Sequence, residues 1–195
     1  LEKVIAGSGV IAIEGNPHAE ISSVCNDSRK VAHGSLFIAV KGFASDGHTY
    51  IATAIGKGAC AIVCEDMDMA RCQVAQAGAE GITLVQVGSS RHALAIIAAN
   101  FYDNPSEKLT LVGITGTNGK TTTVTLLHRM FTALGYNCGL LSTIANYVGN
   151  RGTEAVNTTS DPITINSLMS EMVDAGCEYC FMEVSSIGVE QERVA

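Results

Sequence analysis

The chain has 195 residues, of which 47% are hydrophobic and 16% are charged, and its formal net charge at pH 7 is -7. This composition is typical of a folded chain with one large or two small cores, and it excludes an intrinsically disordered protein. The acidic balance argues against broad binding to nucleic acids or anionic membranes, so a phosphate-containing ligand would have to be held by local geometry.

The first half of the chain alternates between apolar stretches and a helical pattern. Apolar residues at 36–40 predict a strand, residues 49–58 have helical spacing, and the apolar run at 59–64 predicts a buried strand. Gly56 and Gly58 are expected to end the helix before that strand. This half of the chain is therefore predicted to be a small α/β domain.

Another helix is predicted over 90–103, because its apolar residues recur on one helical face. These residues are Leu94, Ile97, Ala98 and Phe101. The polar stretch 104–109 contains a proline and ends the pattern. We therefore predict a domain boundary there, with one domain over 1–106 and a second over 107–195.

The second half begins with an apolar strand at 109–114, followed by a glycine-rich loop and a helix that starts near Lys120. Apolar residues recur at helical spacing as far as Gly135, which is expected to end the helix. They are Leu126, Leu127, Met130, Phe131 and Leu134.

A strand at 138–142, a loop, a helix at 164–176 and a strand at 179–184 complete this half. Strands that alternate with helices predict a parallel sheet with crossover helices. The fold class is therefore α/β, with a small N-terminal domain followed by a parallel-sheet nucleotide-binding domain.

No segment of the sequence has the features of a membrane span or a secretion signal. The apolar run at 59–64 is far shorter than the roughly 20 residues that cross a bilayer. The seven cysteines form no dense framework, which favours reduced thiols in a cytoplasmic protein. Cys177 and Cys180 have CxxC spacing, but the second lies in an apolar stretch, so we interpret both as buried thiols.

The loop GITGTNGKTTT, residues 113–123, nearly matches a phosphate-binding loop, although Ile114 stands where the usual pattern has its first glycine. Strand, loop and helix follow in the order that such a loop needs. Gly116 and Gly119 would let backbone N–H groups turn toward an anion, and the helix start adds partial positive charge. Lys120 would reach the β and γ phosphates, and the Thr121 hydroxyl would bind Mg²⁺. An ordinary glycine turn has no need of Gly-Lys-Thr-Thr at the helix start, so we predict a variant nucleotide site.

A carboxylate, Glu183, ends the last apolar strand in the sequence YCFMEVSS. The carboxyl end of a parallel strand faces the ligand crevice, so we predict that Glu183 holds Mg²⁺ directly or through water. The alternative is a solvated acid at a strand end, which the mostly apolar residues before it disfavour.

Four motifs, in the order of the family, resemble the Mur ligases. GTNGKTTT at 116–123 is similar to the ATP loop of that family, and residues 26–59 resemble the uridine-nucleotide domain of its MurE and MurF branches. NTTSDP at 157–162 and MEVSS at 182–186 favour the MurE branch. The resemblance covers nearly the whole chain.

The resemblance implies an ATP-dependent amide ligase of peptidoglycan synthesis, working in the cytoplasm with ATP and Mg²⁺. Such a ligase adds a diamino acid, diaminopimelate or lysine, to UDP-N-acetylmuramoyl-L-alanyl-D-glutamate through an acyl phosphate. Lys120 and Glu183 would then be catalytic, and Thr121 and Glu183 would bind the metal. The implied nucleotide contacts are Gly116, Thr117, Asn118, Gly119, Lys120, Thr121 and Thr122.

The same resemblance implies contacts with the two ends of the uridine-nucleotide substrate. Positions that match the uridine end are Asn26, Ser28, Phe43, Ala44 and Ser45. Positions that match the muramoyl-peptide end are Asn157, Thr158, Thr159, Ser185, Gln191 and Arg193.

Two departures from the family pattern affect these expectations. Ile187 stands where the family has a histidine, and a packed isoleucine would make a histidine costly to bury. The chain also stops at Ala195, before the family's carbamylated lysine and C-terminal domain. We therefore expect a segment that is inactive alone. The alternatives are a MurF-type ligase and a nucleotide-binding module without catalysis.

Overall fold

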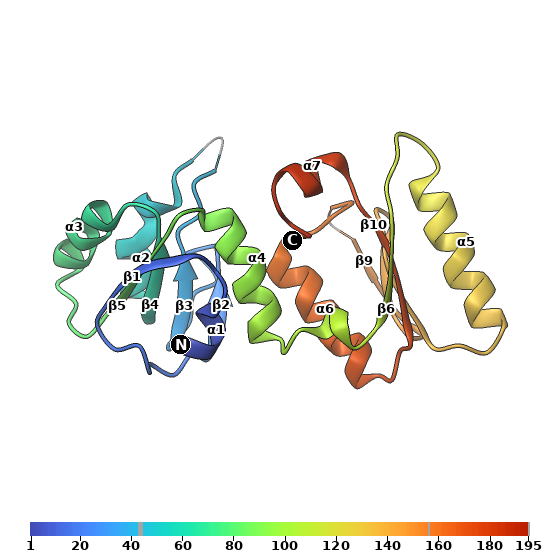
Figure 1. Ribbon diagram of the computed structural model, residues 1–195, viewed down its shortest axis with the longest axis horizontal. Helices are drawn as coiled ribbons and strands as arrows, with labels where there is room; N and C mark the ends of the chain where they lie inside the picture. Colours follow the sequence, from blue (N-terminus) through green and yellow to red (C-terminus); the bar gives the residue numbers. More distant parts are fainter. Residues whose placement is uncertain (43–44, 156, 195) are drawn as a thin grey trace. The chain divides into compact units, whose positions relative to one another are not determined.

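The computed structural model describes residues 1–42, 45–155 and 157–194. The chain forms two compact units, Leu1–Phe101 and Tyr102–Ala195 (Figure 1). The division falls at the end of helix α4, slightly before the boundary placed at 106–107 from the sequence. In the described ranges, no helix is both long enough and apolar enough to cross a bilayer.

The first unit contains a five-stranded sheet with the order β1-β5-β4-β3-β2. Its strands are β1 (Val10–Glu14), β2 (Ser23–Cys25), β3 (Ser35–Ile38), β4 (Ala59–Cys64) and β5 (Thr83–Val87). Four strands run parallel, and β1 pairs antiparallel with β5 at one edge. The two strands predicted in this half correspond to β3 and β4, whereas the sequence pattern indicated none of the other three.

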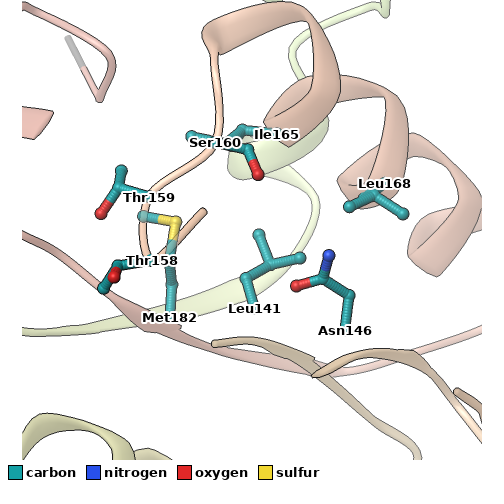
Figure 2. A pocket seen from close by; sticks show the side chains of 8 residues that line it. All are labelled: Leu141, Asn146, Thr158, Thr159, Ser160, Ile165, Leu168 and Met182. Carbon is teal, nitrogen blue, oxygen red and sulfur yellow. The ribbon is translucent and has the colours of Figure 1, made fainter. Parts of the chain in front are cut away.

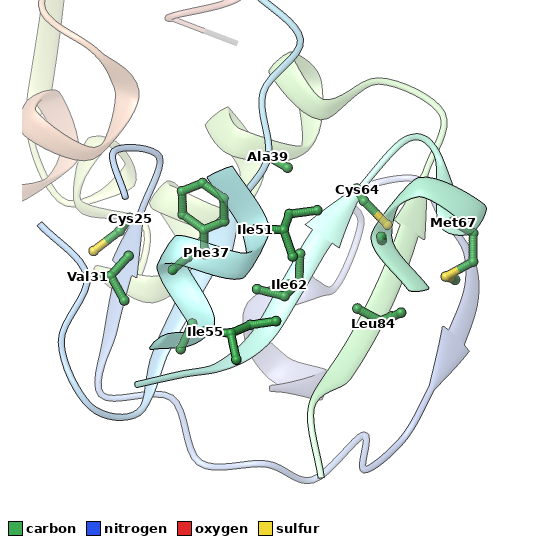
Figure 3. Close-up of a cluster of buried hydrophobic side chains, with 13 residues drawn as sticks. Cys25, Val31, Phe37, Ala39, Ile51, Ile55, Ile62, Cys64, Met67 and Leu84 are labelled. Carbon is green, nitrogen blue, oxygen red and sulfur yellow. The ribbon is translucent and has the colours of Figure 1, made fainter. Parts of the chain in front are cut away.

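Helices cover both faces of this sheet. They are α1 (Glu2–Ile5), η1 (Gly47–Tyr50), α2 (Ile51–Gly56), α3 (Met67–Ala77) and α4 (Ser90–Phe101). Figure 3 shows the core beneath α2 and α3, where Phe37, Ile51 and Ile62 are fully buried. Helix α4 buries Leu94 and Ile97 of the predicted apolar face and contacts α1 and β2.

The second unit has a sheet with the order β6-β10-β7-β8-β9. Its strands are β6 (Thr110–Ile114), β7 (Cys138–Leu141), β8 (Ala145–Val148), β9 (Arg151–Glu154) and β10 (Tyr179–Glu183). The first three in this order run parallel, as predicted. The expected loop after β7 is instead the antiparallel pair β8 and β9. The pattern missed this pair because all four β9 residues are exposed and carry no apolar alternation.

Helices α5 (Lys120–Ala133) and α6 (Pro162–Asp174) lie on opposite faces of this sheet (Figure 1). The remaining helices are η2 (Pro105–Glu107) and α7 (Ser186–Glu190). Alternation along β10 shows the two faces, because Phe181 packs under α5 whereas its neighbours Cys180 and Met182 pack under α6. The predicted burial of Cys180 is confirmed, and burial raises the pKa of its thiol to about 12. Cys177 is buried as well.

The apolar residues of α5 divide into two groups. Leu127 and Phe131 pack against the sheet, and Phe131 meets Phe181 edge to face with ring centroids 5.2 Å apart. The other predicted members are 46–67% exposed. They are Leu126, Met130 and Leu134. The helical spacing was therefore correct, but only part of the apolar pattern marks the core.

Gly56, the last residue of α2, and Gly58, which follows the helix, differ in whether a side chain would fit there, and this difference gives a test of the fold. A Cβ on Gly56 would meet nothing within 4 Å, whereas Gly58 has φ +103° and its Cβ would lie 2.8 Å from the Cα of His33. We expect Gly58→Ala to lower the free energy of unfolding by about 1–3 kcal/mol. The matched Gly56→Ala should raise it by up to about 1 kcal/mol, because Gly56 is helical. Urea unfolding measures both variants, and equal effects would contradict this distinction.

Candidate functional site

The glycine-rich loop joins the end of β6 to the start of α5. Gly116 has φ +145° and Gly119 has φ +83°, values in the left-handed region where glycine is favoured. Gly119 is the N-cap of α5, and no side chain caps the helix. The first-turn N–H groups are therefore without a side-chain acceptor, at the end of the helix where an anion is favoured.

Lys120 folds back over this loop. Its Nζ donates to the carbonyl oxygen of Gly116 at 2.6 Å. The ammonium group therefore lies beside the helix start, where a phosphate on the loop would meet it. Three other positions from the implied nucleotide set are exposed. They are Thr117, Asn118 and Thr122.

Glu183 ends β10 next to β6, with Ile114 as its partner in the sheet. Its side chain is buried, with 1% of the residue exposed, so it is not the solvated acid of the alternative interpretation. Three donors reach its carboxylate. Thr121 Oγ1 donates to Oε2 at 2.9 Å, the N–H of Thr143 donates to Oε1 at 2.8 Å, and Thr143 Oγ1 lies 3.2 Å from Oε2. The two residues predicted to bind Mg²⁺, Thr121 and Glu183, are thus in direct contact.

These groups suit Mg²⁺ rather than a metal held by the protein alone. Within the described ranges, no group of three or more histidine, cysteine, aspartate or glutamate side chains could hold a metal ion. Zinc sites usually need three or four such ligands. Mg²⁺ commonly takes one or two protein oxygens and completes its shell with water and phosphates. One carboxylate and one hydroxyl at a phosphate loop fit that pattern.

The segment that contains Thr158 and Thr159 contacts Thr143 and the backbone of Glu183. Thr158 Oγ1 is 3.1 Å from Thr143 Oγ1. Thr159 is buried, and its hydroxyl donates to the carbonyl oxygen of Glu183 at 3.1 Å. Figure 2 shows both threonines lining a small cavity with Leu141 and Met182. Asn157, predicted to act with them, is exposed.

Three more predicted positions gather around Thr159. The N–H of Ser185 donates to Thr159 Oγ1 at 3.0 Å, and Arg193 Nη1 donates to its carbonyl oxygen at 2.6 Å. Arg193 also donates through Nε and Nη2 to Oε1 of Gln191. These bonds use three of the five guanidinium N–H groups, and the other two have no hydrogen-bond partner among the described residues.

Ile187 is the second residue of the short helix α7 and is 56% exposed. The interpretation that it packs against an apolar neighbour is therefore wrong. The chain leaves β10 and turns into α7 at the N-cap Ser185, and this turn brings Ile187 to the surface. A histidine at this position would not have to be buried.

The remaining predicted positions belong to the first unit. Ser28 is buried after β2, whereas Asn26 and Ser45 are exposed. Phe43 and Ala44 lie outside the described residues. The turn at Ser28 is fixed by Arg29, which hydrogen-bonds Asp27 through side chain and backbone and lowers the pKa of that carboxyl to about 2.

A buried histidine supports the loop that contains Ser45, and sequence reasoning missed it. Only 1% of His48 is exposed. Its Nδ1 is 2.5 Å from Oδ1 of Asp46, and its Nε2 accepts from the N–H of Glu65 at 3.0 Å. Gly47 is required between them, because a Cβ there would lie 2.7 Å from the backbone of Val40. The triplet DGH at 46–48 was the available signal. Thr143 was also missed, since one threonine after a strand has no distinctive pattern.

Two family models match the chain. The model described as "Mur ligase family, catalytic domain" matches residues 20–102, and the "Mur ligase middle domain" matches residues 114–195. Apart from residue 102, the first match lies in the first compact unit, and the second match lies in the second unit. The order of the two matches agrees with the order of the Mur ligase motifs in the sequence, because the motif at 26–59 lies in the first match and those from 116 onward lie in the second.

Curated proteins named UDP-N-acetylmuramoyl-L-alanyl-D-glutamate--2,6-diaminopimelate ligase are similar to the whole chain. The one from Cytophaga hutchinsonii is 49% identical over 195 residues, and the one from Bacteroides fragilis is 46% identical. Each alignment covers 100% of this chain and 39% of the relative. The chain thus spans well under half the length of these curated relatives.

Solved structures show the same fold. A ligase of that same name superposes with a TM-score of 0.72 at 22% identity, covering 94% of this chain and 36% of that one. MurF ligase from Thermotoga maritima, solved in complex with ADP, has a TM-score of 0.52 at 27% identity, covering 86% of this chain and 32% of that one.

Proposed function

Because the chain belongs to the Mur ligase family, we propose that it is the uridine-nucleotide and phosphate-loop part of an ATP-dependent ligase. This ligase joins UDP-N-acetylmuramoyl-L-alanyl-D-glutamate to a diamino acid in peptidoglycan synthesis. The relatives at 42–49% identity have diaminopimelate in their names, which favours that diamino acid. We place the enzyme in the cytoplasm, where ATP is available.

One observation carries the proposal. The uncapped start of α5, Lys120 above the loop and the pair Thr121 and Glu183 together provide positive charge, N–H donors and oxygen ligands at one place. A phosphoryl group in transfer needs these features, because its negative charge must be neutralised while the reactants are aligned.

Each group then has a role in the reaction. ATP would supply the phosphoryl group, and Thr121 and Glu183 would hold a Mg²⁺ ion whose charge would partly neutralise it. Lys120 and the loop N–H groups stabilise the phosphoryl oxygens. Arg193 directs its two remaining N–H groups toward an anionic part of the substrate.

We assign each end of the substrate to predicted positions within one unit. We assign the uridine end to the first unit, where Ser28 and Ser45 follow the family pattern. The muramoyl-peptide end is assigned to the second unit, at Thr159 and five other predicted positions. The six positions are Asn157, Thr158, Thr159, Ser185, Gln191 and Arg193.

Calorimetry with UDP-N-acetylmuramoyl-L-alanyl-D-glutamate tests the proposal on the 195-residue chain. We expect binding, and we expect Ser28→Ala to weaken it by about tenfold, the equivalent of one lost hydrogen bond. The matched control is Ser106→Ala, because Ser106 belongs to the second unit and to no predicted contact. Absence of binding by the unaltered chain would contradict the proposed function, and equal affinities of Ser28→Ala and the control would remove Ser28 from the site.

A further inference from the structure

Thr143 lies between the groups assigned to the cation and the segment assigned to the substrate. It follows β7 and is exposed, so ligands can reach it. Its N–H donates to Oε1 of Glu183 at 2.8 Å. Its hydroxyl oxygen is 3.2 Å from Oε2 of Glu183 and 3.1 Å from Oγ1 of Thr158. One side chain therefore touches both functional regions of this unit.

The hydroxyl of Thr143 has one proton and two acceptors within reach. A threonine hydroxyl donates one hydrogen bond at a time. The Thr143 hydroxyl therefore donates its proton either to Glu183 or to Thr158, and the two choices are alternative orientations of the same O–H group. The carboxylate is the stronger acceptor because it is charged.

Occupancy of Oε2 would decide between these two states. A carboxylate oxygen offers about two lone-pair sites, and Oε2 already meets the hydroxyls of Thr121 and Thr143. A cation bound by the Thr121 hydroxyl and Glu183 would compete with both hydroxyl protons for the lone pairs of Oε2. Both donations to Oε2 would then be lost, and the contact of Thr143 is the longer of the two, at 3.2 Å against 2.9 Å. Its proton then has Thr158 as its nearest acceptor.

We propose that Thr143 is a positioning residue that couples the two sites. When Mg²⁺ and the nucleotide engage Glu183, the Thr143 hydroxyl turns to Thr158 and orders the segment that receives the muramoyl-peptide end. Each ligand then strengthens binding of the other, because both favour the same hydroxyl state. This inference rests on the proposed function and adds a residue that the family motifs did not include.

Isosteric substitution separates this role from structural support. Thr143→Val keeps the shape of the side chain and the N–H bond to Oε1, and it removes only the hydroxyl. Thr143→Ser keeps the hydroxyl. Thr153→Val is the matched control, because Thr153 is exposed on β9 away from Glu183 in the sheet order.

Calorimetry provides the test on the unaltered chain and all three variants. The affinity for UDP-N-acetylmuramoyl-L-alanyl-D-glutamate is measured with and without Mg²⁺ and a non-hydrolysable ATP analogue. The nucleotide should tighten substrate binding about fivefold or more in the unaltered chain, a usual size for coupling between sites. The factor should fall to about one in Thr143→Val, and it should persist in Thr143→Ser and in Thr153→Val.

The other outcomes are equally decisive. An undiminished factor in Thr143→Val, or a factor of one in an unaltered chain that binds both ligands, would overturn the inference and leave the proposed function intact. Failure of the unaltered chain to bind either ligand would contradict the proposed function and the inference with it. If Thr143→Val melts well below the unaltered chain, the comparison with Thr143→Ser decides, and loss of coupling in this serine variant would overturn the role of the hydroxyl.

Discussion

Replacing Lys120 by alanine in the complete ligase that contains this segment is expected to lower the ligation rate by about a thousandfold or more. The ammonium group of Lys120 lies beside the loop and supplies positive charge that stabilises a phosphoryl group during its transfer. Alanine supplies no charge. Removal of one transition-state donor commonly costs a hundred- to a thousandfold, and Lys120 also carries a full charge. The measurement is phosphate release with saturating UDP-substrate and diamino acid.

Binding of the UDP-substrate should survive this change, because its uridine end is assigned to the first unit. Lys3→Ala is the matched control, since Lys3 is an exposed lysine of α1 with no place in the proposed site. Near-normal turnover of Lys120→Ala would contradict the assignment of residues 113–123 as a phosphate-binding loop.

Glu183→Gln should lower turnover by about a hundredfold and raise the Mg²⁺ concentration that half-maximal activity requires. The substitution removes the negative charge that favours a cation and nearly preserves the shape of the side chain. The amide oxygen can still accept from the N–H of Thr143, and the hydroxyls of Thr121 and Thr143 can reverse to accept from the amide N–H₂. The protein should therefore remain folded.

Turnover measured against Mg²⁺ concentration, together with a thermal melt, checks this expectation. Glu178→Gln is the matched control, because Glu178 is an exposed acid just before β10. An unchanged Mg²⁺ requirement in Glu183→Gln would show that the buried carboxylate only supports the fold.

The sequence predicted the elements whose patterns arise from local physics. The predicted start of α5 near Lys120 is confirmed. This start was predictable because the residue before it is a glycine, which adopts the left-handed conformation that precedes the helix. Strand β10 was visible because it is buried on both faces and therefore reads as an apolar run. The antiparallel strands β1 and β9 were missed because they are short and exposed, and β8 was missed because its four residues are too few to show a clear apolar alternation.

The candidate site was predictable only as far as its motifs extended. Glycines, Lys120 and Glu183 have residue types that stand out in a loop or at a strand end. Thr143 and His48 do not, because their importance comes from contacts across 40 and 17 residues of sequence. The exposure of Ile187 was equally hidden, since it depends on where the chain turns after β10.

ADP formation by the complete ligase with each possible pair of co-substrates is the most direct test of the proposed activity. We expect sustained ADP formation with UDP-N-acetylmuramoyl-L-alanyl-D-glutamate and diaminopimelate together, and we expect omission of either to stop turnover. ADP formation that instead required the tripeptide nucleotide and D-alanyl-D-alanine would contradict it in favour of a MurF-type ligase. No ADP formation with any pair, in a protein that still binds both nucleotides, would show a nucleotide-binding module without catalysis.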